Sequence, residues 1–169
     1  MKKCMLLTAG FLMMVLSACG NDTGDAQADV KEQVHSYSVE DHGDIEASIT
    51  SEELVVTDGD EVTKTSLPED EFFVSVAPFV EMTHPCAVHS LTGCQGEMTE
   101  ETFNVKITDE SGNTVVDEEM TSFENGFIDL WLPREQTFTV EIEHDGKTSE
   151  SEISTFEGDD TCITTMQLV

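Results

Sequence analysis

Two cysteines and two histidines gather in one short stretch of a chain that is otherwise poor in cysteine. The stretch covers residues 83–98 and reads THPCAVHSLTGCQGEM. It contains His84, Cys86, His89 and Cys94. Thiolates and imidazoles are ligands for soft or borderline metals such as Cu(I) and zinc, and neighbouring thiols can also exchange electrons. These residue types therefore indicate a metal site or a redox site.

The first nineteen residues have the pattern of an export signal that ends in a lipid-acceptor cysteine. Lys2 and Lys3 form a short basic region, residues 5–15 are apolar, and the string Leu-Ser-Ala-Cys ends at Cys19. This apolar run is shorter than the roughly 20 residues of a membrane-spanning helix, and small residues are typical of a cleavage site. We therefore expect residues 1–19 to be a signal peptide with a lipobox and Cys19 to be the lipid anchor. The protein would be exported to the outer face of the cell membrane or to the periplasm.

Three cysteines remain once this signal is set aside, namely Cys86, Cys94 and Cys162. In an oxidising compartment two of them could form a structural disulfide and leave one buried thiol. An odd number of cysteines in an exported chain is also compatible with metal binding. Seven residues separate Cys86 from Cys94, too many for the C-x2-C pair of a zinc finger, although such a loop can bring both sulfurs to one ion. Both interpretations stay open on composition and spacing.

Histidine and methionine side chains could complete a metal site. His84 and His89 lie within three residues of Cys86, which makes both of them candidate ligands. Pro85 favours an extended backbone and lacks an amide donor, so we expect this segment to be a loop. Thioether sulfur is a ligand for Cu(I), but methionine is more often core filler. Three methionines could play either role: Met82, Met98 and Met166.

The chain is strongly acidic, with 36 acidic and 7 basic residues and a formal net charge of −29. Loss of Lys2 and Lys3 with the signal would leave 5 − 36 = −31. Such a charge excludes nucleic acid as a partner and favours solubility outside the cell. We expect residues 20–33, which are small, polar and acidic, to be a flexible tether. Residues 34–169 are then expected to form one β-rich metal-binding domain.

Most of this domain has the pattern of short strands. Asp58-Gly59 favours a hairpin turn between strands at 54–57 and 61–65, because it supplies the positive φ angles of such turns. Apolar residues at 128, 130 and 132 alternate with those at 127 and 131, as in a strand that has two covered faces. Further strands are expected at 72–77, 103–108, 114–116, 127–132, 137–143, 149–156 and 162–168. The spacing predicts a mainly β protein, an antiparallel β-sandwich-like domain with a short, partly helical or irregular segment over 34–53.

Three separate motifs resemble those of the CueP family of exported copper-binding proteins. The first is His-Pro-Cys-x-x-His-Ser-Leu-Thr-Gly-Cys-Gln-Gly-Glu-Met over 84–98, and the second is Asn-Gly-Phe at 125–127 followed by Leu-Trp-Leu-Pro-Arg at 130–134. The third is Thr-Cys-x-Thr-Thr-x-Gln-Leu over 161–168. The resemblance covers the chain from about residue 71 to the C-terminus and includes all three cysteines.

This resemblance implies a β-rich fold and a role in periplasmic copper handling. It implies that Cys86, Cys94 and Cys162 bind copper, with His84 and His89 as ligands or close neighbours of the ligands. It also raises the expectation of a homodimer formed through the N-terminal region. The chain departs from the family there, because its segment before the first strand is short and acidic and follows a lipobox.

We therefore expect a binding protein and not an enzyme, one that sequesters or relays Cu(I) and could reduce Cu(II) with its thiols. A second protein would donate or accept the copper. Zinc could occupy the same site, since three thiolates and an imidazole suit that ion. Two alternatives are a thiol–disulfide oxidoreductase and a non-catalytic β-sandwich with a structural disulfide. The first would lack the C-x-x-C at a helix start that lowers the pKa of a thiol.

Overall fold

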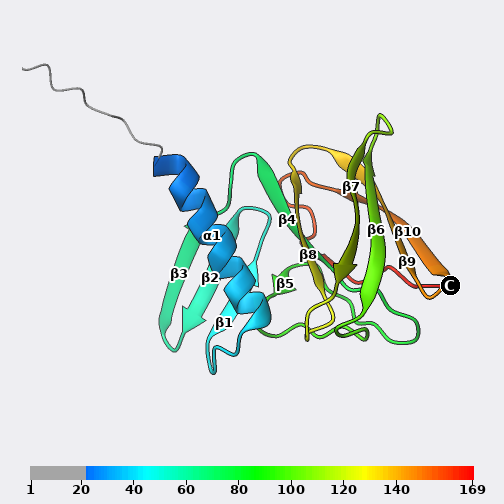
Figure 1. The fold of residues 1–169 in the computed structure, drawn as a ribbon. Helices are drawn as coiled ribbons and strands as arrows, with labels where there is room; N and C mark the ends of the chain where they lie inside the picture. Colours follow the sequence, from blue (N-terminus) through cyan, green and yellow to red (C-terminus); the bar gives the residue numbers. More distant parts are fainter. Residues whose placement is uncertain (1–21) are drawn as a thin grey trace, which may run out of the picture.

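The computed structural model describes residues 22–169 (Figure 1). The expected signal peptide over residues 1–19 and its Cys19 anchor lie outside this range. No helix between residues 22 and 169 is both long and apolar enough to cross a membrane. The described chain contains one helix, α1 (Asp22–Val39), followed by eleven strands.

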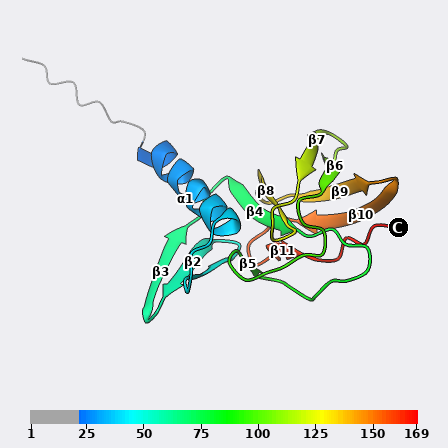
Figure 2. The same ribbon diagram turned by 60° about the horizontal axis from the view of Figure 1, so that its bottom comes forward.

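The strands form three sheets (Figures 1 and 2). The N-terminal sheet has the order β3-β2-β1-β5, with β1 (Glu46–Ile49), β2 (Glu53–Asp58), β3 (Glu61–Ser66) and β5 (His89–Ser90). The central sheet has the order β11-β4-β8, with β4 (Glu71–Val76), β8 (Ile128–Pro133) and β11 (Cys162–Ile163). The outer sheet has the order β10-β9-β6-β7, with β6 (Thr102–Asp109), β7 (Thr114–Thr121), β9 (Thr137–His144) and β10 (Lys147–Ser154). All pairs of strands are antiparallel except β4 and β11, which are parallel.

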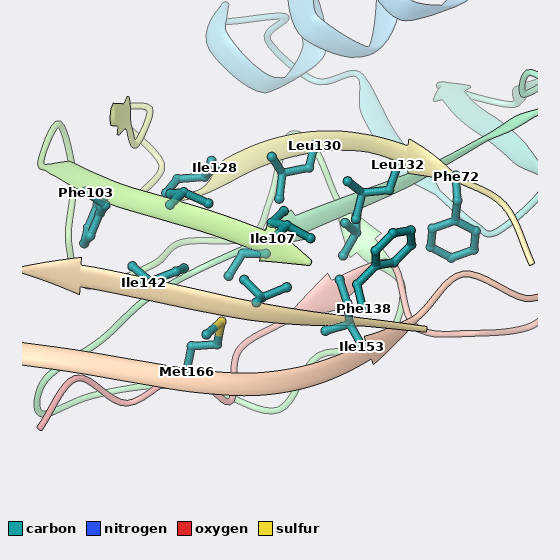
Figure 3. Close-up of a cluster of buried hydrophobic side chains, with 14 of the residues drawn as sticks. Phe72, Phe103, Ile107, Ile128, Leu130, Leu132, Phe138, Ile142, Ile153 and Met166 are labelled. Atoms are coloured by element: carbon teal, nitrogen blue, oxygen red, sulfur yellow. The ribbon is translucent and has the colours of Figure 1, made fainter. Parts of the chain in front are cut away.

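The main hydrophobic core lies between the central and outer sheets (Figure 3). Alternate residues of each strand enter it, because successive side chains of a strand point to opposite faces. In β8 these are the residues at 128, 130 and 132, as the alternation predicts. Phe72 of β4 lies on the same face of the central sheet, and Met166 of the C-terminal segment also enters the core. The outer sheet contributes the facing residues from β6 and β9, which include Phe103, Ile107, Phe138 and Ile142. The predicted mainly β, sandwich-like fold is confirmed.

The opposite face of the central sheet is covered as well. The side chains of Phe73 and Trp131 project from that face and pack with residues of the N-terminal sheet and of α1. The ring of Trp131 also lies beneath the ammonium group of Lys31, 5.1 Å from the ring centroid, and Lys31 pairs with the carboxylate of Glu71. The central sheet is therefore buried on both faces, which explains why every residue of β4 after Glu71 is buried.

The expectation of a flexible tether over residues 20–33 is wrong for the described part of that segment. Residues 22–39 form α1, and the side chains of Val30 and Val34 are buried against Leu54 and other residues of the N-terminal sheet. The two valines are four residues apart and so lie on one face of a helix. Only this narrow apolar stripe faces the protein. The other residues of the helix are mostly polar, so the sequence shows no clear amphipathic pattern there. The boundary at residue 33 consequently falls inside an element.

Two other expectations agree with the structure only in part. The segment over 34–53 is partly helical, as predicted, because residues 34–39 form the end of α1, but it also contains β1, an inner strand of the N-terminal sheet. The last strand is shorter than the expected 162–168, because β11 has only two residues. Beyond it the chain makes an isolated parallel bridge between Phe79 and Gln167.

Candidate metal centre

Three cysteines and one histidine converge where the N-terminal sheet meets the central sheet. The sulfur atoms of Cys86, Cys94 and Cys162 and a ring nitrogen of His89 all lie within 4.8 Å of one another. His89 begins β5 and pairs with Ile49 of β1, whereas Cys162 begins β11. Figure 2 places β5 and β11 close together at this junction. β5, β11 and the two loops on either side of β5, which carry Cys86 and Cys94, thus supply one donor group.

His89 is the most unusual member of the group. Its side chain is 0% exposed, and neither ring nitrogen has a hydrogen-bond partner. The imidazole is packed between aromatic rings, with ring centroids 4.5 Å from Phe127 and 6.2 Å from Phe73. A buried polar atom without a partner costs roughly 1–3 kcal/mol. A metal ion bound by one of these nitrogens would supply the missing partner.

The three cysteines are free thiols in the structure. The sulfur atoms of Cys86 and Cys94 are 3.6 Å apart, which is a hydrogen-bonding contact between thiols. Cys162 is buried, and Cys86 and Cys94 are half-buried. The ligand group therefore has a buried end at Cys162 and a partly exposed end at Cys86. A structural disulfide is not present among these cysteines.

Contacts within the cluster divide the thiols by acidity. A hydrogen bond from Cys162 is the main cause that lowers the pKa of Cys94 far below that of an ordinary thiol, and the nearby rings of His89 and His84 act in the same direction. The same bond between Cys162 and Cys94, together with burial, raises the pKa of Cys162. Burial raises the pKa of Cys86. These contacts thus make Cys94 the most acidic of the three thiols.

Backbone hydrogen bonds fix the loop that carries Cys86. The carbonyl oxygen of Ala87 accepts bonds from the amides of Thr161 (2.9 Å) and Cys162 (3.2 Å). The Thr161 hydroxyl donates to the carbonyl of Ile49 (2.6 Å) and accepts from the amide of His89 (3.0 Å). Thr161 therefore ties together β1, β5 and the start of β11, and holds two of the four donors in register.

The remaining candidates from the sequence lie at the edge of the cluster or away from it. His84 is near enough to contribute to the lowered pKa of Cys94 but is outside the group of four donors. Met166 is buried in the main core, and Met98 packs against that core. Met82 is 70% exposed on the loop before His84.

Sequence reasoning missed three residues that shape the centre: Thr161, Asn125 and Phe127. Thr161 precedes the expected strand over 162–168 and has no obvious role in the sequence, but it is buried and bonds to two segments remote in sequence. Asn125 and Phe127 belong to a turn far from any cysteine, yet Phe127 is in the same buried cluster as Cys162. The only available signal was that all three residues lie in the motifs that resemble those of the CueP family, and none of the three has metal-binding chemistry of its own.

The fold and the donor set define a class, that of a β-rich protein with a donor group suited to a soft metal. Three sulfurs and an imidazole, placed mostly out of water, match the preferences of Cu(I) and zinc and not those of magnesium or calcium. Among residues 22–169 no second group of three or more such donors is found.

Comparison with known proteins assigns the family. The family model described as "Periplasmic copper-binding protein CueP" matches residues 29–167, so the chain belongs to the CueP family. The crystal structure of S.CueP is similar, with 42% sequence identity and a TM-score of 0.79, over 83% of this chain and 89% of that one. A search of curated proteins gave no significant match. The resemblance found in the sequence is thereby confirmed.

Proposed function

We propose that the protein binds one Cu(I) ion through Cys86, Cys94, Cys162 and His89, and so sequesters or relays copper outside the cytoplasm. The observation that carries this proposal is His89, a fully buried imidazole with two unpartnered nitrogens beside three thiols. Hydrogen bonding within the protein does not account for such a side chain. A soft metal ion does, because it would accept the lone pair of one ring nitrogen and replace the thiol protons.

Membership of the CueP family supports copper as the metal. The donor set alone would also suit zinc, which forms tetrahedral sites with the same ligands. Softness favours Cu(I) over Cu(II), because thiolates bind Cu(I) strongly and are oxidised by Cu(II). Zinc in purified protein would therefore be a competitor at the same site and would not contradict the proposal.

Reduction of Cu(II) is a chemical step open to the same thiols. The 3.6 Å contact between the sulfurs of Cys86 and Cys94 suits formation of a disulfide. Two Cu(II) ions would each accept one electron and become Cu(I), while two thiols lose two electrons and two protons and form the S–S bond. An external dithiol would have to reduce this disulfide before the pair could bind copper again. The protein would then be a binding protein with a slow redox step, not a turnover enzyme.

We further propose that Cys19 carries the lipid anchor and that a second protein donates or accepts the copper. The lipobox supports the first part, and the half-exposed position of Cys86 at the edge of the donor group supports the second. A Cys19→Ser variant tests the anchor. We expect the wild-type chain in the detergent phase of a detergent–water partition and the variant in the aqueous phase. A homodimer remains a prediction from the family resemblance.

Anaerobic titration with Cu(I) against a competing chelator tests the proposal. The reduced chain from residue 20 onward contains every residue that the structure describes and only the three thiols of the cluster. We expect one Cu(I) per chain, and a loss of affinity of more than about tenfold (1.4 kcal/mol) on Cys162→Ser. Unchanged affinity in that variant would show that the remote cysteine is not a ligand and would overturn the proposal.

A thiol–disulfide oxidoreductase is the second candidate, favoured by the lowered pKa of Cys94 beside the thiol of Cys86. It predicts steady turnover of a disulfide substrate with a dithiol reductant in the absence of any metal. The copper proposal predicts one stoichiometric oxidation of the Cys86–Cys94 pair and no turnover.

A further inference from the structure

We propose that the Asn125–Gly126 turn is a positioning device for the metal centre, which sets where Cys94 and His89 lie. The inference rests on the proposed function, because its consequence is tight metal binding. The turn lies between β7 and β8 and contains none of the donor groups. Its contacts nevertheless reach two of the four donors from two directions.

The first contact is a close approach between two glycines. A Cβ atom added to Gly126 would lie 2.8 Å from the backbone of Gly96, and one added to Gly96 would lie 2.6 Å from the carbonyl oxygen of Gly126. Real Cβ atoms essentially never come so close to backbone atoms. The amide of Gly96 also donates a 2.7 Å hydrogen bond to the carbonyl of Asn125. The chain two residues after Cys94 is thus seated directly on the turn.

The other side of Cys94 is fixed by its own local turn. The amide of Cys94 donates to the carbonyl of Ser90 (3.0 Å), and a Cβ at Gly93 would lie 2.7 Å from the Ser90 hydroxyl oxygen. Ser90 belongs to β5, next to His89. The segment from Ser90 to Gly96 is therefore held at one end by the N-terminal sheet and at the other end by the Asn125–Gly126 turn. A shift of either end moves the sulfur of Cys94.

The second contact passes through Phe127 to His89. The side-chain oxygen of Asn125 accepts a hydrogen bond from the amide of Phe127 (3.0 Å), which fixes the residue after the turn. The ring of Phe127 is fully buried and lies 4.5 Å, centroid to centroid, from the imidazole of His89. Since the imidazole nitrogens make no hydrogen bonds, its orientation depends on these aromatic walls. The turn thereby sets the position of the one wall that is closest to the imidazole.

The same asparagine connects the centre to α1. Its side-chain amide donates to the carbonyl of Ser38 (3.3 Å), near the end of the helix, and the Ser38 hydroxyl donates to Asp129 (2.6 Å). The other oxygen of that carboxylate accepts from Ser75 of β4 (2.6 Å), which is the register partner of Cys162. The helix therefore supports the turn from outside. Through Asp129 and Ser75 it is also connected to the strand that pairs with Cys162.

A matched pair of glycine variants tests the inference. Gly126 and Gly146 have the same φ of +78°, but a Cβ at Gly146 meets nothing within 4 Å. Gly126→Ala and Gly146→Ala thus carry the same backbone strain, and only the first displaces Gly96. We expect Gly126→Ala to bind Cu(I) about 10- to 100-fold more weakly than the wild type, as other changes next to metal ligands do. Gly146→Ala should bind within about twofold of the wild type.

Cobalt(II) supplies a readout that a general loss of stability would not change. The intensity of its sulfur-to-metal charge-transfer absorption depends on how many thiolates bind the ion. We expect this absorption to fall in folded Gly126→Ala at saturating cobalt and to be unchanged in Gly146→Ala. Equal affinities and equal spectra for the two variants would overturn the positioning role while leaving the copper proposal intact.

A metal-free measurement separates failure of the two proposals. In a Cys162→Ser background, the equilibrium between the Cys86–Cys94 pair and glutathione reports how well the two sulfurs are placed. We expect Gly126→Ala to disfavour this disulfide relative to Gly146→Ala, even if the wild type binds no copper. An unchanged equilibrium together with absent copper binding would contradict both proposals.

Asn125→Ala is a second test in case Gly126→Ala does not fold. It removes the side-chain bonds to Phe127 and Ser38 but keeps the backbone carbonyl that holds Gly96. We expect weakened Cu(I) binding, with recovery in Asn125→Asp, which retains the oxygen that accepts from Phe127. Asn113→Ala is the control, because Asn113 bonds only to Asp109 in a remote surface turn. Equal binding by both alanine variants would contradict the inference.

Discussion

At the scale of single residues, the centre combines a buried base with thiols of unequal acidity. His89 lacks hydrogen-bond partners, and Cys94 is the cluster member most ready to lose its proton. The unpartnered imidazole destabilises the metal-free protein, and the acidic thiol contributes nothing to its stability. Both properties favour binding of a metal cation. The residues therefore favour metal binding at the expense of stability in the free protein.

His89→Leu tests this trade-off. Leucine has a similar volume and fits the aromatic surroundings, so the variant removes two buried polar atoms that have no partners. We expect the metal-free variant to be as stable as the wild type or more stable. The gain in the free energy of unfolding, measured with urea, should be up to about 1–3 kcal/mol. Its affinity for Cu(I) should fall by more than about tenfold.

His144→Leu is the control for His89. The ring of His144 bonds to the carbonyl of Thr102 at 2.8 Å, far from the cysteines. Its loss should lower stability slightly and leave Cu(I) affinity unchanged. A His89→Leu variant that is less stable than the wild type without metal, yet binds copper normally, would show that the imidazole has a structural role only.

At the scale of elements, the donors depend on short connections between sheets. β5 and β11 have two residues each, and neither would be stable alone. Thr161 joins them, since its hydroxyl bonds to the carbonyl of Ile49 and to the amide of His89. The loop before Cys86 has a similar support at Glu97, whose carboxylate accepts bonds from the amides of three successive residues, Val80 to Met82.

Thr161→Val removes one hydroxyl without a large change in shape. The carbonyl of Ile49 and the amide of His89 would both remain buried and lose this partner, so we expect a loss of about 2 kcal/mol in the free energy of unfolding. Urea denaturation measures it. Thr165→Val, at an exposed position four residues later, should change stability by less than about 0.5 kcal/mol. Equal effects would contradict the role of Thr161 as the link between the sheets.

Glu97→Gln gives a prediction about pH. Hydrogen bonds from the backbone amides, first that of Glu81, lower the pKa of the Glu97 carboxyl in the folded protein. A lowered pKa means that its stabilising effect is present at neutral pH and is lost as the pH falls through the folded value. We expect the variant to be less stable than the wild type at about pH 7, on the order of 1 kcal/mol after solvent screening.

The difference in stability between Glu97→Gln and the wild type should shrink steadily as the pH is lowered below the pKa of an ordinary glutamate. Thermal unfolding over a pH series measures this. Glu119→Gln, exposed on β7, is the control and should show little difference from the wild type at neutral pH. A gap between Glu97→Gln and the wild type that stays constant with pH would mean that the carboxylate charge is not involved.

At the scale of the whole molecule, charge opposes folding. The chain has a formal net charge of −29, and like charges crowd together in the folded state. The structure compensates with a central sheet that is buried on both faces. The metal centre lies beside that sheet, at the junction with the N-terminal sheet.

Salt should therefore stabilise the protein. Raising ionic strength from about 0.01 M to about 1 M shortens the screening length from roughly 30 Å to roughly 3 Å. We expect the Tm of the metal-free protein to rise by several degrees, at about 2–4 °C per kcal/mol. Sodium and potassium chloride should act alike if screening is the cause. A Tm that is constant or falls with salt would contradict self-repulsion.

The sequence allowed prediction of most strands and of the residues in the candidate donor group, for different physical reasons. Strands such as β8 were predictable because the alternation of apolar residues lies within one short stretch of sequence. The cysteines were predictable because a thiol is recognisable as a metal ligand from its residue type alone. The part of α1 before residue 34 was not predicted, because only a narrow apolar stripe of the helix, with Val30 and Val34, is buried in a polar sequence. The roles of Thr161 and Asn125 depend on hydrogen-bond partners about 70 to 110 residues away in the sequence. No local sequence pattern predicts these contacts. The choice of His89 over His84 as the donor likewise follows from burial.

X-ray absorption of the Cu(I)-loaded protein, prepared anaerobically from the reduced chain, tests the central claim most directly. The number and type of atoms bound to copper distinguish this donor set from any other. We predict a first shell of three sulfur atoms and one imidazole nitrogen, with the imidazole signal absent in His89→Leu and one sulfur absent in Cys162→Ser. A shell with only two sulfurs in the wild type, or spectra that do not change in the two variants, would contradict the proposed centre.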